Sequence, residues 1–519
     1  MRRGELATIR QHESGSPWHF RKQQQQRAGT VERVTIVGGG LAGMAAAAAL
    51  VHHGIPIRLL ESRPRLGGRA SSFRDQTTGE SIDNCQHVAM GCCTNFFRFC
   101  EMVGIRDQFV PAEVLHFFGP EGRMDRFAAG PLPAPLHLAG AFWGLRYLNL
   151  AEKLAIARAL SKLATTTQRG ITFAQWLAEQ RQPQRVVDRF WNVVLVSALS
   201  ESLDRIDLQQ ARKVFVDGFL RNRQGWVVEI PQQPLDDLWA GPVRRMLEGG
   251  NALVEVGQGV ARVELNQVEL NHVEPNRVEP SRAVPSGGRV TGLTLRDARM
   301  IPTGEVILAL PWHRLGEIFP PGSALQPVID QASKLEAAPI SSVHLWYDRP
   351  ITPLPHATFV SGLCQWLFQK PVEREHAAST DKASPGRYGY QVVISASRVL
   401  AGQSQAETIA QVEEELKVYF PPLREATRLH ARVVTEHKAV FSPLVGSEAL
   451  RPRQQSPIAN LQLAGDWTET GWPATMEGAV RSGFLAAENV LERLEQPTRV
   501  LVDDLPTSNL ARLLWGRLG

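Results

Sequence analysis

Three glycines near residue 40, and a glutamate that follows them, have the types and spacing of a nucleotide-binding turn. Gly38, Gly40 and Gly43 form G-x-G-x-x-G, and Glu61 lies eighteen residues after the last of them. Such glycines bring backbone N–H groups and a helix N-terminus against a pyrophosphate, while the acid accepts from ribose hydroxyls. Because an acid there disfavours a 2′-phosphate, the turn predicts a dinucleotide other than NADP. The same prediction includes the neighbouring residues Leu41, Ala42 and Ser62.

A second turn with an acid and glycines lies near the other end of the chain. It follows the apolar run "LQLA", and a stretch of small residues begins about ten positions later. A helix starting there would direct its N–H groups and the positive end of its dipole at a ligand. Two such turns predict one ligand that is long enough to need both. The residues predicted to contact it here are Gly465, Asp466, Met476, Glu477, Gly478 and Ala479.

The elements that must position the first turn have the order of an α/β fold. A β-branched run at 34–37 precedes the glycines, and a helix of small residues is predicted from Leu41 to about His53. A second strand at 57–60 then ends at Glu61. This context makes the glycine pattern specific, because the pattern alone is a weak signal.

The middle of the chain changes character twice. Residues 151–164 and 186–200 carry apolar side chains at helical spacing, which predicts a helical insertion. From 321 to 455 the side chains alternate as in a sheet with one face on a cavity. The pentapeptide repeat at 263–282, "VELNQVELNHVEPNRVEPSR", matches no solenoid period and is interpreted as an expanded loop.

Composition excludes several classes of protein. The net charge of +5 is concentrated in residues 1–27, where six Arg and Lys face two Glu, so no nucleic-acid surface is expected elsewhere. Residues 1–30 are predicted to be a disordered basic extension. Apolar runs are shorter than the roughly 18 residues of a membrane span, and no secretory signal is recognised. Five cysteines without C-x-x-C spacing predict no metal site and a cytoplasmic location.

The residues after Glu61 identify the dinucleotide through a resemblance. Gly67, Gly68 and Arg69 resemble the glycine-glycine-arginine signature of the amine oxidase and phytoene desaturase superfamily of flavoproteins. The resemblance implies FAD, with Arg69 beside its phosphates and Val260 near its adenine. It also gives the second turn a role, because Asp466 would contact the ribityl chain or the phosphates. The helix start at 476–479 would lie at the polar edge of the flavin ring.

Longer stretches resemble one family within that superfamily, hydroxysqualene dehydroxylase. They are "DNCQHVAMGCCTNFFRF", "LPAPLHL", "TFAQWL", "QWLF" and "GDWTETGWPATMEGAVRSG", in this order along the chain. The resemblance implies reduction of hydroxysqualene to squalene with electrons from reduced FAD, in hopanoid biosynthesis; the electron donor is not identified. Cys85 and Cys93 depart from the family pattern near the flavin. Neither lies in a covalent-flavin motif, so FAD is expected to bind non-covalently.

The resemblance also assigns candidate catalytic and substrate residues. It places Asp83, Gln86 and His87 at the edge of the flavin ring. His87 is the hypothetical proton donor for the leaving hydroxyl, because an imidazole can be protonated near neutral pH, and Asp83 would orient it or donate itself. Anchoring of the loop is the alternative for both. The aromatic residues predicted to face the apolar substrate are Trp366, Phe368, Trp467 and Trp472, with core packing as the alternative.

The C-terminal residues suit a membrane surface. Leu510, Leu513, Leu514 and Leu518 lie near one face of a helix, with Trp515 and two arginines beside them. This pattern predicts shallow peripheral docking on the inner face of a membrane. A helix packed back on its own domain is the alternative.

The sequence therefore predicts an α/β, amine oxidase-like fold with a discontinuous Rossmann-like FAD-binding domain. An inserted helical and antiparallel-sheet domain would bind the substrate. Two other functions stay open: a phytoene- or carotenoid-type FAD-dependent desaturase, and a non-catalytic escort of prenyl chains. The predicted segments are 1–30 (extension), 31–115, 241–320 and 456–495 (FAD), 116–240 and 321–455 (substrate), 263–282 (repeat) and 496–519 (amphipathic tail).

Overall fold

Five parallel strands from distant parts of the chain form the sheet beneath the glycine turn. A computed structural model describes residues 33–266, 288–370 and 387–516, and from Arg33 onward the chain makes one compact unit. The strand order is β10-β2-β1-β14-β20, with every pair parallel. Their bounds are β1 (Val34–Val37), β2 (Ile57–Glu61), β10 (Ala252–Val256), β14 (Val306–Leu308) and β20 (Leu461–Leu463). The strands expected before and after the glycine turn are β1 and β2.

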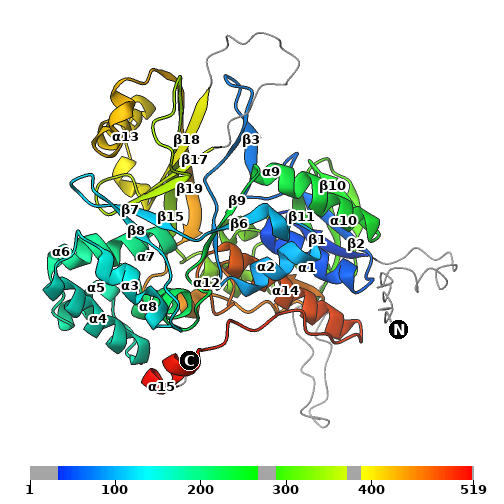
Figure 1. The fold of residues 1–519 in the computed structure, drawn as a ribbon. Coiled ribbons are helices and arrows are strands. Elements are labelled where there is room, and N and C mark those ends of the chain that lie inside the picture. The colour runs from blue at the N-terminus through cyan, green and yellow to red at the C-terminus, as the bar shows by residue number, and fades with distance from the viewer. Residues whose placement is uncertain (1–32, 267–287, 371–386, 517–519) are drawn as a thin grey trace, which may run out of the picture. The chain divides into compact units, whose positions relative to one another are not determined.

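Helices cover one face of this sheet because their small residues allow close packing. Helix α1 (Leu41–His52) lies along α14 (Met476–Arg493), and eleven of the twelve α1 residues are buried. A Cβ added to Gly483 of α14 would collide with the carbonyl oxygen of Ala42. Helices α2 (Thr94–Met102) and α10 (Arg244–Gly249) also pack on α1 (Figure 1). The glycine turn therefore rests on a helix pair formed by both ends of the chain.

A small antiparallel sheet covers the other face. It consists of β11 (Val260–Asn266), β12 (Arg289–Leu295) and β13 (Met300–Pro302), and its apolar side chains share a core with Val37, Leu60 and Leu308. Strand β11 contains the first four residues of the pentapeptide repeat; the others lie outside the described residues. The predicted extension at 1–30 also lies outside them.

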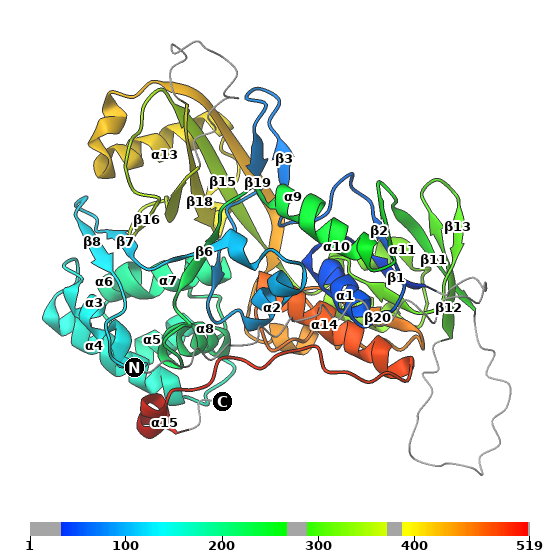
Figure 2. The same cartoon turned by 45° about the vertical axis from the view of Figure 1, so that its right-hand side comes forward.

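A seven-stranded sheet forms the second large layer of the molecule (Figures 1 and 2). Its order is β19-β15-β18-β17-β16-β7-β8, antiparallel except for the β16–β7 pair. Helix α13 (Gln405–Tyr419) shares a core with one face. The strands are β7 (Leu115–Phe118), β8 (Met124–Phe127), β15 (Ala337–Tyr347), β16 (His356–Phe359), β17 (Trp366–Gln369), β18 (Tyr388–Ser395) and β19 (Arg428–Phe441).

The helical region between β8 and β10 has an aromatic core. Trp176, Trp191, Phe173 and Phe215 are buried in it and stack or meet edge to face. The predicted helix at 151–164 lies in α4, which begins with a reciprocal cap between Asn149 and Glu152. The helices are α3 (Ala139–Gly144), α4 (Leu150–Thr165), α5 (Phe173–Glu179), α6 (Gln184–Val186), α7 (Asn192–Leu199) and α8 (Leu208–Phe215).

Short elements connect these layers. Strands β5 (Ala89–Met90), β9 (Val228–Pro231) and β6 (Phe109–Ala112) form one small sheet, and β3 (Ser72–Arg74) pairs with β4 (Ser81–Asp83). Within the described ranges, no helix is long and apolar enough to cross a membrane. The remaining helices are α9 (Leu235–Leu238), α11 (Leu315–Ile318), α12 (Gln326–Ala332) and α15 (Asn509–Trp515).

Candidate cofactor and active site

The glycine turn leaves an open space in front of α1. Gly38 has φ +108°, and a Cβ there would meet the Ala309 carbonyl oxygen. Gly43 packs on the backbone of Gly38 and does not line the cavity. At Gly40, by contrast, the nearest atom to an added Cβ is the Cα of Gly68, 3.9 Å away. No side chain caps the first turn of α1, so its N–H groups are available to an anion.

Glu61 stands at the carboxyl end of β2, facing the same space. One oxygen accepts from the N–H of Gly39 at 2.7 Å, and the other accepts from the N–H of Arg63 at 2.7 Å. These bonds hold the carboxylate at the cavity wall. A carboxylate fixed there can still accept from ribose hydroxyls through its remaining lone pairs.

An ion pair joins the second turn to the loop that follows β2. Asp466 is almost fully buried and accepts from the guanidinium of Arg69 at 2.6 Å. Arg69 also donates to the carbonyl of Ala439 on β19 at 2.7 Å. Burial lowers the pKa of Arg69, but the charge and hydrogen bond of Asp466 outweigh burial and leave that pKa above its usual value. The cation therefore stays charged beside the predicted phosphates.

One cavity of about 810 Å³ joins both turns, the seven-stranded sheet and α7. Its wall includes Ile340 and Val393 from the sheet and Ala198 from α7, so apolar groups face the same space as the glycine turn. Sixteen predicted site residues line it: Gly38, Gly40, Leu41, Ala42, Glu61, Ser62, Gly68, Arg69, Gln86, His87, Val260, Gly465, Asp466, Trp467, Met476 and Ala479.

Glu477 and Gly478, two predicted site residues at the start of α14, do not line the cavity. The buried carboxylate of Glu477 accepts from the N–H groups of Asn95 (3.2 Å) and Phe96 (2.7 Å), and so holds the N-terminus of α2. Burial raises the pKa of Glu477, while these bonds and Arg481 act against the rise. Gly478 packs on the Pro473 carbonyl and donates to the Thr475 hydroxyl at 3.1 Å. Neither lines the cavity, so their roles lie in the shape of the turn.

His87 lines the cavity as a neutral imidazole. Its Nδ1–H donates to the carbonyl of Cys85 at 2.8 Å, which leaves Nε2 as an acceptor. Burial lowers the pKa of His87, and Arg69 lowers it further, against the opposing effects of Asp83 and the Cys85 carbonyl. This direction disagrees with the premise that His87 is protonated near neutral pH.

Asp83 lies behind the cavity wall. Its carboxylate accepts from the hydroxyl of Ser72 and from the N–H of Leu235 at 3.0 Å, which ties β3 and β4 to the start of α9. Burial raises the pKa of Asp83 despite these bonds. Because Asp83 does not line the cavity, its geometry fits the anchoring alternative.

Of the four aromatic residues expected at the substrate, only Trp467 lines the cavity. Trp366 and Phe368 stack with centroids 5.5 Å apart, and Trp366 is paired across the sheet with Val393 of the cavity wall. Trp472 lies instead beneath the ammonium of Lys213 at 4.4 Å. Trp366 and Phe368 therefore support the wall from the adjoining strand, and Trp472 belongs to a different cluster.

Several cavity residues were not expected from the sequence. Pro311 and His313 follow β14, and the carboxyl ends of parallel strands are where ligands bind in such sheets. That rule could have identified them. Ser197, Ala198 and Ser200 come from the end of α7, and only the tertiary fold brings them to the site.

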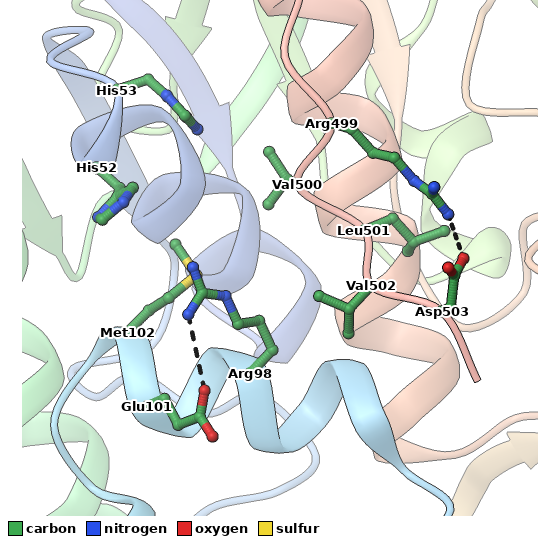
Figure 3. A pocket seen from close by; sticks show the side chains of 10 residues that line it. All are labelled: His52, His53, Arg98, Glu101, Met102, Arg499, Val500, Leu501, Val502 and Asp503. Carbon is green, nitrogen blue, oxygen red and sulfur yellow. Dashed lines mark hydrogen bonds and ion pairs between the residues drawn. The ribbon is translucent and has the colours of Figure 1, made fainter. Parts of the chain in front are cut away.

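A second hollow of about 600 Å³ lies at the other end of α1, as Figure 3 shows. Arg98 and Arg499 line it, but each pairs with an acid: Arg98 with Glu101 at 3.7 Å, and Arg499 with Asp503, four residues further along the chain. None of the predicted site residues lines this hollow. Within the described ranges, no group of three His, Cys, Asp or Glu could hold a metal ion.

The cavity fits FAD by its own geometry. The open space at Gly40 and the uncapped start of α1 suit a pyrophosphate, and Arg69 adds a cation there. The start of α14 lines the same cavity through Met476 and Ala479. Burial raises the pKa of Cys85 to about 12, so its thiol stays protonated and unreactive beside the cofactor.

Comparison with known proteins agrees with this fit. Residues 41–491 match the family of flavin containing amine oxidoreductases. The 15-cis-phytoene desaturase of Synechococcus elongatus is 25% identical over 487 residues, covering 90% of this chain and 97% of the relative. The zeta-carotene desaturase of Zea mays is 24% identical, covering 97% and 93%.

Solved structures show the same fold. An oxidoreductase from Methanosarcina mazei aligns with a TM-score of 0.64 at 15% identity, covering 89% of this chain and all of that one. Cyclohexylamine oxidase from Brevibacterium oxydans aligns at 0.62 and 18%, covering 89% and 99%. The chain belongs to the flavin containing amine oxidoreductase family. It is an FAD-dependent oxidoreductase. The family match and the structural similarity confirm the predicted fold, enzyme class and cofactor. Membership of this family also argues against a non-catalytic escort.

Proposed function

We propose that this enzyme acts on a long apolar isoprenoid and that it removes hydrogen from a polyene of the phytoene type. The near full-length similarity to phytoene and zeta-carotene desaturases carries the proposal. Apolar side chains from β15, β18 and α7 line the cavity beside the predicted flavin position, as a hydrocarbon chain requires.

The state of His87 favours this direction of reaction. When bound, FAD would supply the two-electron chemistry by accepting hydride from the substrate, and an electron acceptor such as a quinone or oxygen would be needed to reoxidise it. Loss of hydride from one carbon leaves a proton to be removed from its neighbour. His87 lines the cavity, and the Nε2 of its neutral imidazole can accept that proton, whereas proton donation would need the charged form that burial disfavours.

Reduction of hydroxysqualene to squalene is the second candidate. The stretches that resemble hydroxysqualene dehydroxylase support it, and two of them, around Gln86 and Trp467, contribute residues to the cavity wall. In this reaction the carbon–oxygen bond would break, the hydroxyl would leave with a proton as water, and reduced FAD would supply the hydride that the carbon needs.

Product analysis under anaerobic conditions separates the two. Oxidised enzyme with a quinone is given phytoene, and photoreduced enzyme is given hydroxysqualene, with products identified by mass spectrometry. New conjugated double bonds in the first arm support desaturation. Squalene from the second arm alone would replace it with the second candidate, and turnover in neither arm would contradict both.

A further inference from the structure

Large apolar side chains remain exposed on one part of the helical region. Leu150 is 67% exposed and Leu513 is 82% exposed, although both belong to helices with buried opposite faces. They lie on α4, on α15 and on the loop and short helix that precede α4. We call this set the α4–α15 surface: Leu132, Leu136, Trp143, Leu150, Leu154, Leu513 and Leu514.

Specific contacts join these segments into one surface. Leu150, Leu154 and Ser161 lie on one face of α4, because their spacings of four and seven are close to whole helical turns. The indole of Trp515 donates to the hydroxyl of Ser161 at 3.1 Å, which seats α15 at the end of that face. Both views show α15 beside α4 (Figures 1 and 2).

The loop that contains Leu132 is also held beside α15. Ser508, the residue before α15, donates from its hydroxyl to the carbonyl of Ala134 at 2.5 Å. Ala511 is buried against Ala164, so α15 directs its inner face at the domain and leaves Leu513 and Leu514 outward. The inner face of α15 therefore agrees with the alternative prediction of a helix packed on its own domain, while the outer face stays exposed. Leu518 lies outside the described residues.

The segments that carry the surface hold more basic than acidic residues. In residues 128–165 and 505–516 the single acid is Glu152, which is buried in the cap of α4. Arg158, Lys162 and Arg512 are exposed, and no acid in the described part of the chain forms an ion pair with them. An exposed apolar surface bordered by cations complements anionic lipid headgroups above acyl chains, and Trp143 suits the boundary between them.

We propose that the α4–α15 surface docks on an anionic lipid bilayer. A second copy of the chain is the less suitable occupant, because a symmetric contact would bring the same unpaired cations together. Docking goes beyond the proposed reaction and does not depend on it. It would place α8, which packs on both α4 and the cavity helix α7, between the membrane and the site.

Vesicle flotation of the full-length holoenzyme tests the proposal. Vesicles of equal parts phosphatidylglycerol and phosphatidylcholine are compared with pure phosphatidylcholine. The variants are Leu513→Glu/Leu514→Glu and Leu150→Glu/Leu154→Glu. The matched control is Met300→Glu/Val399→Glu, since these side chains are 65% and 67% exposed on other elements. Flavin absorbance and thermal melting establish that each protein is folded.

We expect the wild type and the control to float with the anionic vesicles, and binding by each test variant to fall about tenfold or more. High salt should weaken the binding. Equal flotation of test variants and control would overturn the proposal. So would a dimer in light scattering that the Leu513→Glu/Leu514→Glu change dissociates, because a second copy would then cover the surface.

Discussion

The guanidinium of Arg69 donates to the carboxylate of Asp466 at 2.6 Å across a separation of 397 residues. Arg69 follows the glycine turn of β1 and α1, and Asp466 follows β20, so the bond connects the two halves of the cofactor site. This contact and others in the site and elsewhere in the fold lead to five predictions.

Asp466→Asn should lower the FAD content of the purified protein. The change leaves Arg69 without its counter-ion where the cofactor phosphates are expected, and a broken buried pair costs about 3 kcal/mol. Flavin absorbance per mole of protein measures the result. Glu248→Gln breaks the exposed pair of Glu248 with Arg244 and serves as the control. Full FAD occupancy in Asp466→Asn would show that the ion pair does not support the cofactor.

Gly40→Ala should fold normally but bind FAD weakly. The protein atom nearest to an added Cβ is 3.9 Å away, so the Cβ would occupy the open space left for the pyrophosphate. We expect at least about a tenfold rise in the dissociation constant, measured by titration of apoprotein. Gly140→Ala, where an added Cβ meets nothing within 4 Å on α3, is the matched control. Unchanged affinity would place the phosphates elsewhere.

His87→Gln should keep FAD but reduce turnover by about a hundredfold if the imidazole accepts a proton. Since the pKa of His87 is below its usual value, the wild-type rate should not fall as pH rises from about 6.5 to 8. A loss of rate across that range, absent in His87→Gln, would instead identify His87 as a proton donor. Near-normal turnover of the variant would exclude either role.

Glu477→Gln should destabilise the fold by about 1–3 kcal/mol. The amide cannot replace both oxygens, which accept from Asn95 and Phe96 at the start of α2. Chemical denaturation of the apoprotein measures the loss without a contribution from FAD. A variant that binds FAD poorly yet unfolds like the wild type would return Glu477 to the cofactor site.

Acid should weaken the fold partly through His137. This buried side chain has a pKa of about 4, below its ordinary value of 6.5, because burial and the nearby Arg223 disfavour the charged ring. Between these values the unfolded chain takes up a proton that the folded chain does not, so the free energy of unfolding falls as pH falls. The effect is at most about 3 kcal/mol. His137→Gln should show a shallower loss from pH 6.5 to 4 in denaturant titrations; the same slope would contradict the assignment.

The sequence predicts the site best where backbone geometry determines the residue type. Gly38 and Gly40 have such roles, and the strand expected at 34–37 coincides with β1. Prediction from the sequence fails where a side chain could point either into the cavity or toward another element. Glu477 begins a helix beside the cavity, but its side chain turns to α2, and no local pattern distinguishes these directions.

The wall opposite the glycine turn is less predictable for a related reason. Alternation places Trp366 and Phe368 on one face of a strand, as the structure shows. The residue that reaches the cavity is Val393 of β18, and its position beside Trp366 depends on the register of β17 against β18. Ser200 reaches the cavity from the end of α7 through helix packing alone. Such long-range relations are absent from the spacing of residues along the chain.

The position of β20 has a consequence for synthesis in the cell. This strand begins at residue 461, so a ribosome releases β1 and the glycine turn long before β20, which completes the sheet beside β14, and α14, which packs on α1. The nascent chain can form the first turn early, yet the Arg69–Asp466 bond must wait for the last part of translation. If this pair supports FAD as predicted above, a fragment that stops before residue 461 lacks the contact that retains the cofactor.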